Sequence, residues 1–156
     1  MRSSPAYSLR GAVTAPLLRG AGRDWDPAFL GRWSAPLLVM ARAMLAYIFI
    51  VEGVGKIGGY AAVAHYMLAH GVSSSLLPPV ILTELGGGLL VLLGLATRWA
   101  AIALFGFCLL TAFIFHMGAD QAIHFQKNVA MAGGFLALVV AGPGAWSLDG
   151  WRSRIR

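Results

Sequence analysis

Four long apolar stretches alternate with shorter polar segments along the chain. They cover about residues 36–55, 77–95, 99–116 and 127–141. A helix rises about 1.5 Å per residue, so roughly 20 apolar residues cross the hydrocarbon core of a bilayer. The fourth stretch is short, and we expect Ile123 and Phe125 to extend it outward. The pattern predicts an all-α membrane protein with a four-transmembrane-helix bundle over residues 35–145.

The segments between these stretches carry their own structural signals. Residues 56–75 contain Gly, His and Ser and form the first external connection, in which we expect a short helix over Tyr60–Ala69. Pro78 and Pro79 fall in the first turn of the second span, where a missing amide donor costs little. The next connection, residues 96–98, is so short that it allows only a tight turn.

Both ends of the chain are predicted to be basic cytoplasmic tails. Residues 1–34 form an Arg-rich N-terminal tail, and residues 146–156 form a basic C-terminal tail. Asp26 is expected to cap a short interfacial helix. A mitochondrial transit peptide is also Arg-rich, but it is poor in acidic residues, and Asp24 and Asp26 argue against one here.

The basic residues also predict the orientation of the bundle. Near the span ends, one side of the membrane carries only Lys56 and Lys127, and the other carries arginines. These are Arg19, Arg23, Arg32, Arg98, Arg152, Arg154 and Arg156. Because cytoplasmic loops are enriched in Lys and Arg, both termini are expected inside (N-in/C-in). Trp99, Trp146 and Trp151 then fall near one interface.

Composition agrees with a lipid environment. Hydrophobic residues make up 58% of the chain and charged residues 12%, and the mean hydropathy is +0.74. A water-soluble fold cannot bury that much apolar surface. The net charge of +6, concentrated in the tails, suits anionic phospholipid headgroups better than nucleic acid. Cys108 is the only cysteine, so any redox chemistry must come from a cofactor or a protein partner.

A few polar residues interrupt the apolar stretches at comparable depth. They are Glu52 and Lys56 in span one, Glu84 in span two, His116 in span three, and Lys127 and Asn128 in span four. A charge near the bilayer centre costs roughly 2.5–3.5 kcal/mol, so each one must face the bundle interior, reach the interface or find a partner. All four helices are therefore expected to contribute to one polar layer.

These residues allow both structural and chemical interpretations. Glu52 and Lys56 have the i,i+4 spacing of a helical ion pair. Glu84 precedes the strip Gly86-Gly87-Gly88, where another helix can approach closely, and it can form an interhelical bridge to Lys56, Lys127 or Asn128. Alternatively, Glu84 accepts a proton or faces a quinone carbonyl. His116 is either an interface histidine or a proton donor that titrates near pH 6.5.

A metal site is not predicted. His65 and His70 lie five positions apart and His116 and His124 eight apart, so neither pair has the i,i+4 spacing that puts two ligands on one helical face. No flavin, nicotinamide or iron–sulfur motif is present, and the glycine strip follows no strand.

The combination of these segments resembles the DoxX family of small bacterial membrane proteins. The segments that carry the resemblance are 48–56 with Glu52 and Lys56, 84–98 from Glu84 to Arg98, Phe115-His116, 126–134 with Lys127 and Asn128, and Ser147-Leu148-Asp149. It covers about residues 37–150, and the Arg-rich N-terminal tail lies outside it. The resemblance implies a four-helix protein of the bacterial inner membrane, often described as an oxidoreductase after a quinone-linked thiosulfate-oxidising system.

Two functions from different classes follow. The first is a membrane subunit or accessory of a quinone- or thiol-linked redox system, with a quinone as the possible cofactor and a redox protein as the possible partner. Its candidate catalytic residues are Glu84, His116 and Lys127, supported by Glu52, Lys56 and Asn128. The second is a non-enzymatic membrane scaffold or small-solute transporter, in which the same residues hold the bundle together or line a polar path.

Overall fold

The structure, a computed structural model, describes residues 27–155. The chain divides into two units after Trp33, and the account below concerns the second, Ser34–Arg156. The features expected within residues 1–26, including the cap at Asp26, lie outside the described residues.

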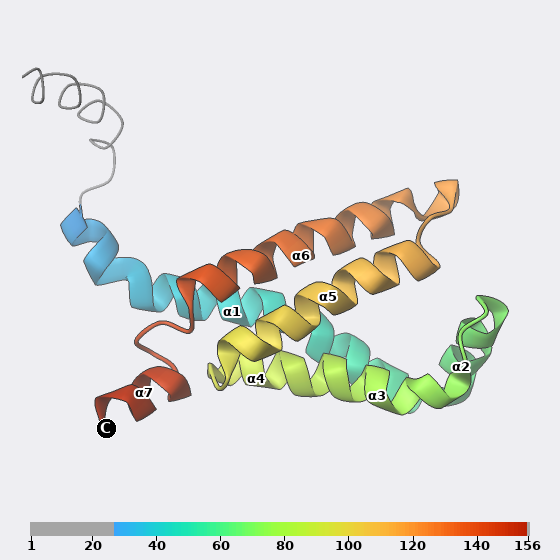
Figure 1. Cartoon of the computed structure of the whole chain (residues 1–156), viewed down its shortest axis with the longest axis horizontal. Coiled ribbons are helices and arrows are strands. Elements are labelled where there is room, and N and C mark those ends of the chain that lie inside the picture. The colour runs from blue at the N-terminus through green and yellow to red at the C-terminus, as the bar shows by residue number, and fades with distance from the viewer. Residues whose placement is uncertain (1–26, 156) are drawn as a thin grey trace, which may run out of the picture. The chain divides into compact units, whose positions relative to one another are not determined.

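Every regular element between residues 27 and 155 is helical (Figure 1). The α-helices are α1 (Pro27–Gly58), α2 (Tyr60–Ala69), α3 (Leu77–Ile81), α4 (Gly87–Leu93), α5 (Thr97–Phe115), α6 (Ala122–Ala141) and α7 (Leu148–Arg154). Short 3-10 turns cover Ser74–Leu76 and Ala119–Gln121, and a π-helical turn, Leu82–Gly86, joins α3 to α4.

Four helical segments are long and apolar enough to cross a membrane. They are Gly31–Gly58, Ser74–Leu93, Thr97–Phe115 and Ala119–Ala141. The predicted all-α fold with four spans is therefore confirmed. The expected helix over Tyr60–Ala69 is α2, and the fourth span includes Ile123 and Phe125 as expected.

Two helix bounds differ from those expected from the sequence. Helix α1 runs without a break from Pro27 to Gly58, so among the described residues the segment after Asp26 is continuous with the first span. The second span ends at Leu93 instead of residue 95 because Gly94 and Ala96 have the left-handed φ angles 69° and 47°. A left-handed residue ends an α-helix, and this allows α5 to begin at Thr97.

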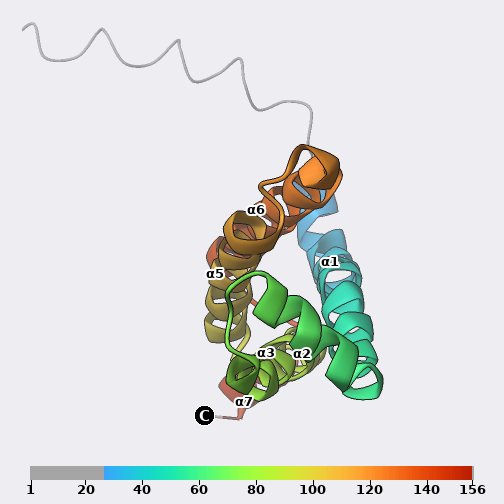
Figure 2. The same ribbon diagram turned by 90° about the vertical axis from the view of Figure 1, so that its right-hand side faces the viewer.

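Helices α5 and α6 run side by side in opposite directions, and α4 lies against α5 (Figures 1 and 2). Helix α1 packs on the second span through glycines. A Cβ added at Gly53 would lie 2.9 Å from the Cβ of Leu85, and one added at Gly88 would lie 3.2 Å from the Cβ of Phe49. The glycine strip thus allows the close helix approach that the sequence predicted.

The core of the bundle consists mainly of small and aliphatic residues around a few aromatic rings. Phe49 of α1 lies edge-to-face with Phe135 of α6 and Phe107 of α5, with ring centroids 5.3 Å and 6.3 Å apart. Ala46, Val91 and Leu104 are fully buried in the same cluster. Edge-to-face rings interlock three helices at the level just below the polar layer.

The segment after α6, which includes the predicted basic tail, is folded onto the bundle. The Ser147 hydroxyl caps α7 by accepting a hydrogen bond from the Gly150 amide at 2.9 Å. The Asp149 carboxylate accepts hydrogen bonds from the amides of Ala96 and Thr97, both at 3.0 Å, and from the Thr97 hydroxyl at 3.2 Å. Asp149 thereby caps the N-terminus of α5 from outside that helix.

Arg42 completes this arrangement from inside α1. Arg42 as a whole residue is only 2% exposed, and its Nη2 donates a hydrogen bond to the carbonyl oxygen of Trp146. The Asp149 amide donates to the Gly94 carbonyl oxygen at 2.9 Å. We call the residues Arg42, Gly94, Thr97, Trp146 and Asp149 the α7 cluster.

Candidate functional site

The second span carries its single charged residue on the π-helical turn. Pro78 and Pro79 open α3, and the Thr83 hydroxyl donates to the Pro79 carbonyl oxygen at 2.8 Å. In the next turn the helix widens to the i,i+5 pattern, and Glu84 is buried there, only 5% exposed. Single π turns inside α-helices occur often at functional sites.

Glu84 meets the basic residue that α1 offers at the same depth. The Nζ of Lys56 lies 2.9 Å from Oε2 of Glu84 and 3.3 Å from Oε2 of Glu52. The side chain of Glu84 is 7% exposed, against 56% for that of Glu52, so the two carboxylates that share Lys56 differ strongly in solvation. Of the three partners predicted for Glu84, the structure shows Lys56.

Polar side chains from α5, α6 and the turn between them face this group. The rings of His116 and His124 stack with centroids 5.3 Å apart. The Asn128 amide donates to the His124 carbonyl oxygen at 2.9 Å, and the Thr111 hydroxyl lies 3.4 Å from Asn128 Oδ1. Lys127 lies on the same side and forms no ion pair with any residue that the structure describes.

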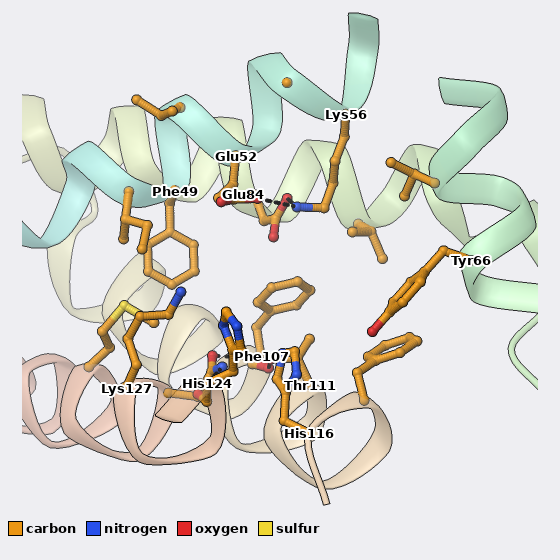
Figure 3. A pocket seen from close by; sticks show the side chains of 18 of the residues that line it. Phe49, Glu52, Lys56, Tyr66, Glu84, Phe107, Thr111, His116, His124 and Lys127 are labelled. Carbon is orange, nitrogen blue, oxygen red and sulfur yellow. Dashed lines mark hydrogen bonds and ion pairs between the residues drawn. The ribbon is translucent and has the colours of Figure 1, made fainter. Parts of the chain in front are cut away.

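The two groups are the opposite walls of a cavity of about 700 Å³ (Figure 3). We call it the polar cavity. Its lining residues are Ile48, Phe49, Val51, Glu52, Gly55, Lys56, Ala62, Val63, Tyr66, Met67, Val80, Glu84, Phe107, Thr111, Phe115, His116, His124, Lys127, Asn128 and Met131. Figure 3 shows Glu52, Glu84 and Lys56 on one wall and Lys127, His124, Thr111 and His116 on the other, with the rings of Phe49 and Phe107 between them.

Helix α2 closes one end of the polar cavity. The Tyr66 ring stacks on Phe115 at the end of α5, with centroids 5.6 Å apart, and His70 lies 5.4 Å from the same Phe115 ring. His70 Nδ1 also lies 2.8 Å from the Tyr66 carbonyl oxygen. These aromatic contacts hold α2 against α5, so the cavity is bounded by residues of every span and of the connection between the first two.

His116 lies just after the third span, where its surroundings favour the neutral imidazole. Burial lowers the pKa of His116, although a hydrogen bond with Gln121 opposes the change. The neighbouring charges of His124, Lys127 and His70 lower the pKa further. A neutral imidazole presents one donor and one acceptor nitrogen, so His116 can donate and accept a hydrogen bond at the cavity and can take up a proton there.

The structure brings all six residues singled out from the sequence to this one cavity: Glu52, Lys56, Glu84, His116, Lys127 and Asn128. Sequence reasoning missed His124, Tyr66 and Phe107 as lining residues. The His116–His124 spacing was weighed only for metal binding, and no three metal-ligating side chains gather within residues 27–155. Aromatic residues are common throughout the spans, and nothing in their spacing separates the ones facing the cavity from those facing lipid.

Comparisons with known proteins agree with this fold. The DoxX family pattern matches residues 37–117. The chain is 47% identical over 115 residues to the inner membrane protein YqjF of Escherichia coli K12, which covers 72% of this chain and 88% of that protein. It is 37% identical over 123 residues to the inner membrane protein YphA of the same organism, with coverage again 72% and 88%. No solved structure matches.

The length of the family match and the identity to two inner membrane proteins settle the class of this molecule. It is a multi-pass protein of the inner membrane, in which four apolar helices enclose a polar cavity. The chain belongs to the DoxX family.

Proposed function

We propose that the polar cavity binds a quinone and that the protein serves as a membrane subunit or accessory of a quinone-linked redox system. The observation that carries the proposal is the pair of polar walls that face each other across the aromatic rings of Phe49 and Phe107. A quinone ring has two carbonyl oxygens on opposite edges and two apolar faces. The arrangement of the walls and rings matches that pattern.

The dimensions support the same ligand class. Small-molecule sites typically enclose about 300–1,000 Å³ and combine apolar walls with a few polar groups. The cavity volume of about 700 Å³ lies within this range. In the proposed complex, one carbonyl oxygen accepts a hydrogen bond from Lys56 beside Glu84, and the other accepts one from Lys127 or His124.

The proposed roles follow from charge and protonation. Reduction of a quinone to a quinol adds two electrons and two protons to the ring oxygens. Glu84 on one wall and His116 on the other can each hold one proton, and the two lysines attract negative charge that develops on the oxygens. The buried Cys108 stands alone, so the electrons come from a redox protein partner in this proposal.

The test compares two carboxylates that share one lysine. Glu84→Gln removes the buried charge on the π turn, and Glu52→Gln removes the exposed one, so Lys56 loses one anionic neighbour in each variant. Each protein is purified in detergent, its thermal unfolding midpoint is recorded, and binding of a short-chain ubiquinone is titrated. Quinone-dependent electron transfer is then measured with the partner that co-purifies.

Glu84→Gln is expected to fold and to lose most of the electron transfer, because an amide cannot exchange the proton. Glu52→Gln is expected to retain it. Equal activity of wild type and Glu84→Gln would remove Glu84 from the chemistry. A wild-type protein that binds no quinone would refute the proposal and leave the scaffold or small-solute transporter, for which the same cavity would be a polar path.

A further inference from the structure

Three exposed arginines lie at the start of α5 and on α7: Arg98, Arg152 and Arg154. None of them forms a salt bridge with any residue between 31 and 155, although the charge of Arg152 acts on Asp149. Three guanidinium groups and one carboxylate leave a net positive surface at the end of a membrane bundle.

Two of these arginines contact the same loop. A Cβ added at Gly142 would lie 3.2 Å from Nη2 of Arg98, so this guanidinium lies directly over the loop. Nη2 of Arg154 donates a hydrogen bond to the Ala145 carbonyl oxygen at 3.1 Å. The loop turns sharply between these contacts because Gly142 and Gly144 have φ angles of 77° and 78°, which favour glycine.

The loop borders a groove of about 410 Å³. The groove is lined by Pro143, Gly144, Ala145, Asp149, Gly150, Ser153 and Arg154. Asp149 is the only acidic residue between residues 121 and 155, and its oxygens accept hydrogen bonds from Ala96 and Thr97. Its charge offsets one of the three arginine charges, so the groove and its surroundings remain positive. The Ser153 hydroxyl adds a polar group to the lining.

Tryptophans place this groove at the depth of lipid headgroups. Trp99 is 77% exposed, Trp146 63% and Trp151 59%, which is unusual for the largest side chain in a folded protein. Tryptophan is enriched at the boundary between hydrocarbon and water, where its ring lies among the headgroups. The three rings flank the ends of the spans on which the groove opens.

We propose that this groove and the loop beside it bind the phosphodiester headgroup of an anionic phospholipid, with Arg154 of the groove lining and Arg98 over the loop holding the phosphate and Ser153 facing the glycerol. A guanidinium group donates paired hydrogen bonds to phosphate oxygens, and an anionic lipid supplies negative charge to a surface that has three arginines and one aspartate. This binding does not depend on the quinone proposal, because the groove and the polar cavity share no residue.

The experiment uses the whole protein in a neutral detergent with a dansyl-labelled phosphatidylglycerol. Energy transfer from tryptophan to dansyl reports binding and gives a Kd. Unlabelled short-chain phosphatidylglycerol, phosphatidylcholine and inorganic phosphate then compete for the site. Arg98→Gln and Arg154→Gln remove the two arginines that contact the loop. They are compared with Arg152→Gln, which removes the same charge from α7 outside the groove lining and outside these loop contacts.

Arg98→Gln and Arg154→Gln are each expected to weaken binding roughly fivefold, as expected for one arginine at an anionic headgroup. Arg152→Gln is expected to change the Kd less than about twofold, because the charge of Arg152 acts on Asp149 and its side chain does not line the groove. Phosphatidylglycerol is expected to displace the probe, and phosphatidylcholine is not.

Three results would overturn the proposal. An equal loss in all three variants would show diffuse attraction without a site. Displacement by phosphatidylcholine as effective as by phosphatidylglycerol would remove the selectivity for charge. Displacement by inorganic phosphate at the same concentration would make the groove a site for a free anion. If one of these variants fails to fold, the competition of phosphatidylglycerol, phosphatidylcholine and inorganic phosphate for the wild-type protein tests the proposal by itself.

Discussion

The α7 cluster and the polar cavity lie at different levels of the same bundle, and they treat buried charge in different ways. In the α7 cluster, Asp149 accepts three hydrogen bonds, and Arg42 donates to the Leu38 and Trp146 carbonyl oxygens. In the polar cavity, charged groups line a space of about 700 Å³, and Lys127 has no acidic partner among the described residues. Polar groups that hydrogen-bond to one another stabilise a fold, whereas polar groups that face a cavity are available to bind a ligand.

The largest effect is expected from breaking the α7 cluster. Asp149→Ala removes the acceptor for the amides of Ala96 and Thr97 and leaves the buried guanidinium of Arg42 without its nearby negative charge. We expect a loss of about 2 kcal/mol in the free energy of unfolding. Asp120→Ala is the matched control, because the Asp120 carboxylate is exposed and binds only the neighbouring Gln121 side chain. The free energy of unfolding of both variants is measured in mixed micelles as the SDS fraction is raised. Similar losses of this free energy in Asp149→Ala and Asp120→Ala would contradict a special role for Asp149.

A smaller loss in the free energy of unfolding is expected when a charged residue of the polar cavity is replaced by a neutral one. Lys56→Met leaves Glu84 buried without its partner, and we expect a cost of about 1–2 kcal/mol. The double variant Lys56→Met/Glu84→Gln is expected to recover more than half of that cost, because the unpaired carboxylate is then gone. The same SDS titration gives the interaction energy. A double variant whose loss equals the sum of the two single losses would show that the ion pair adds no stability.

The smallest effect is a pH dependence centred on His116. Burial and the nearby His124, Lys127 and His70 lower the pKa of His116 in the folded protein, so the unfolded chain binds its proton more readily. The stability from His116 is therefore present above the ordinary pKa of about 6.5 and is lost as the pH falls through that value toward the folded pKa. His116→Gln is expected to flatten the curve of unfolding midpoint against pH between about 5 and 7. An unchanged curve in the variant would assign the dependence to another group.

Much of the fold follows from the apolar pattern, because a bilayer demands continuous helices of a fixed minimum length. The depth of Glu84, Lys56 and Lys127 also follows from counting residues along each span. The sequence does not show which face of each helix points into the bundle. In a membrane both the lipid-facing and the core-facing residues are apolar, so the periodicity of apolar residues does not distinguish the two faces. His124 and Phe107 were therefore not identified as lining the cavity.

The α7 cluster was missed for a different physical reason. Arg42 and Asp149 lie far apart in the sequence, and each alone resembles an isolated charge near a membrane interface. Only the left-handed turn at Gly94 and Ala96 brings the start of α5 within reach of Asp149. A cap supplied by a distant segment leaves no local spacing to recognise, in contrast to a cap at the helix's own first residue.

The π-helical turn at Leu82–Gly86 has a consequence for how the gene of such a protein can change. A π turn holds one more residue than the α-helix would need over the same length, so deletion of one residue there would still leave a span of sufficient length and hydropathy. Such a deletion would restore α-helical winding and leave the two halves of the span near their present orientation. Deletion of one residue elsewhere in the span would instead rotate one half by about 100° relative to the other. Either Glu84 would then leave Lys56, or Gly88 would leave Phe49. The second span should therefore tolerate a change of length best at the π-helical turn.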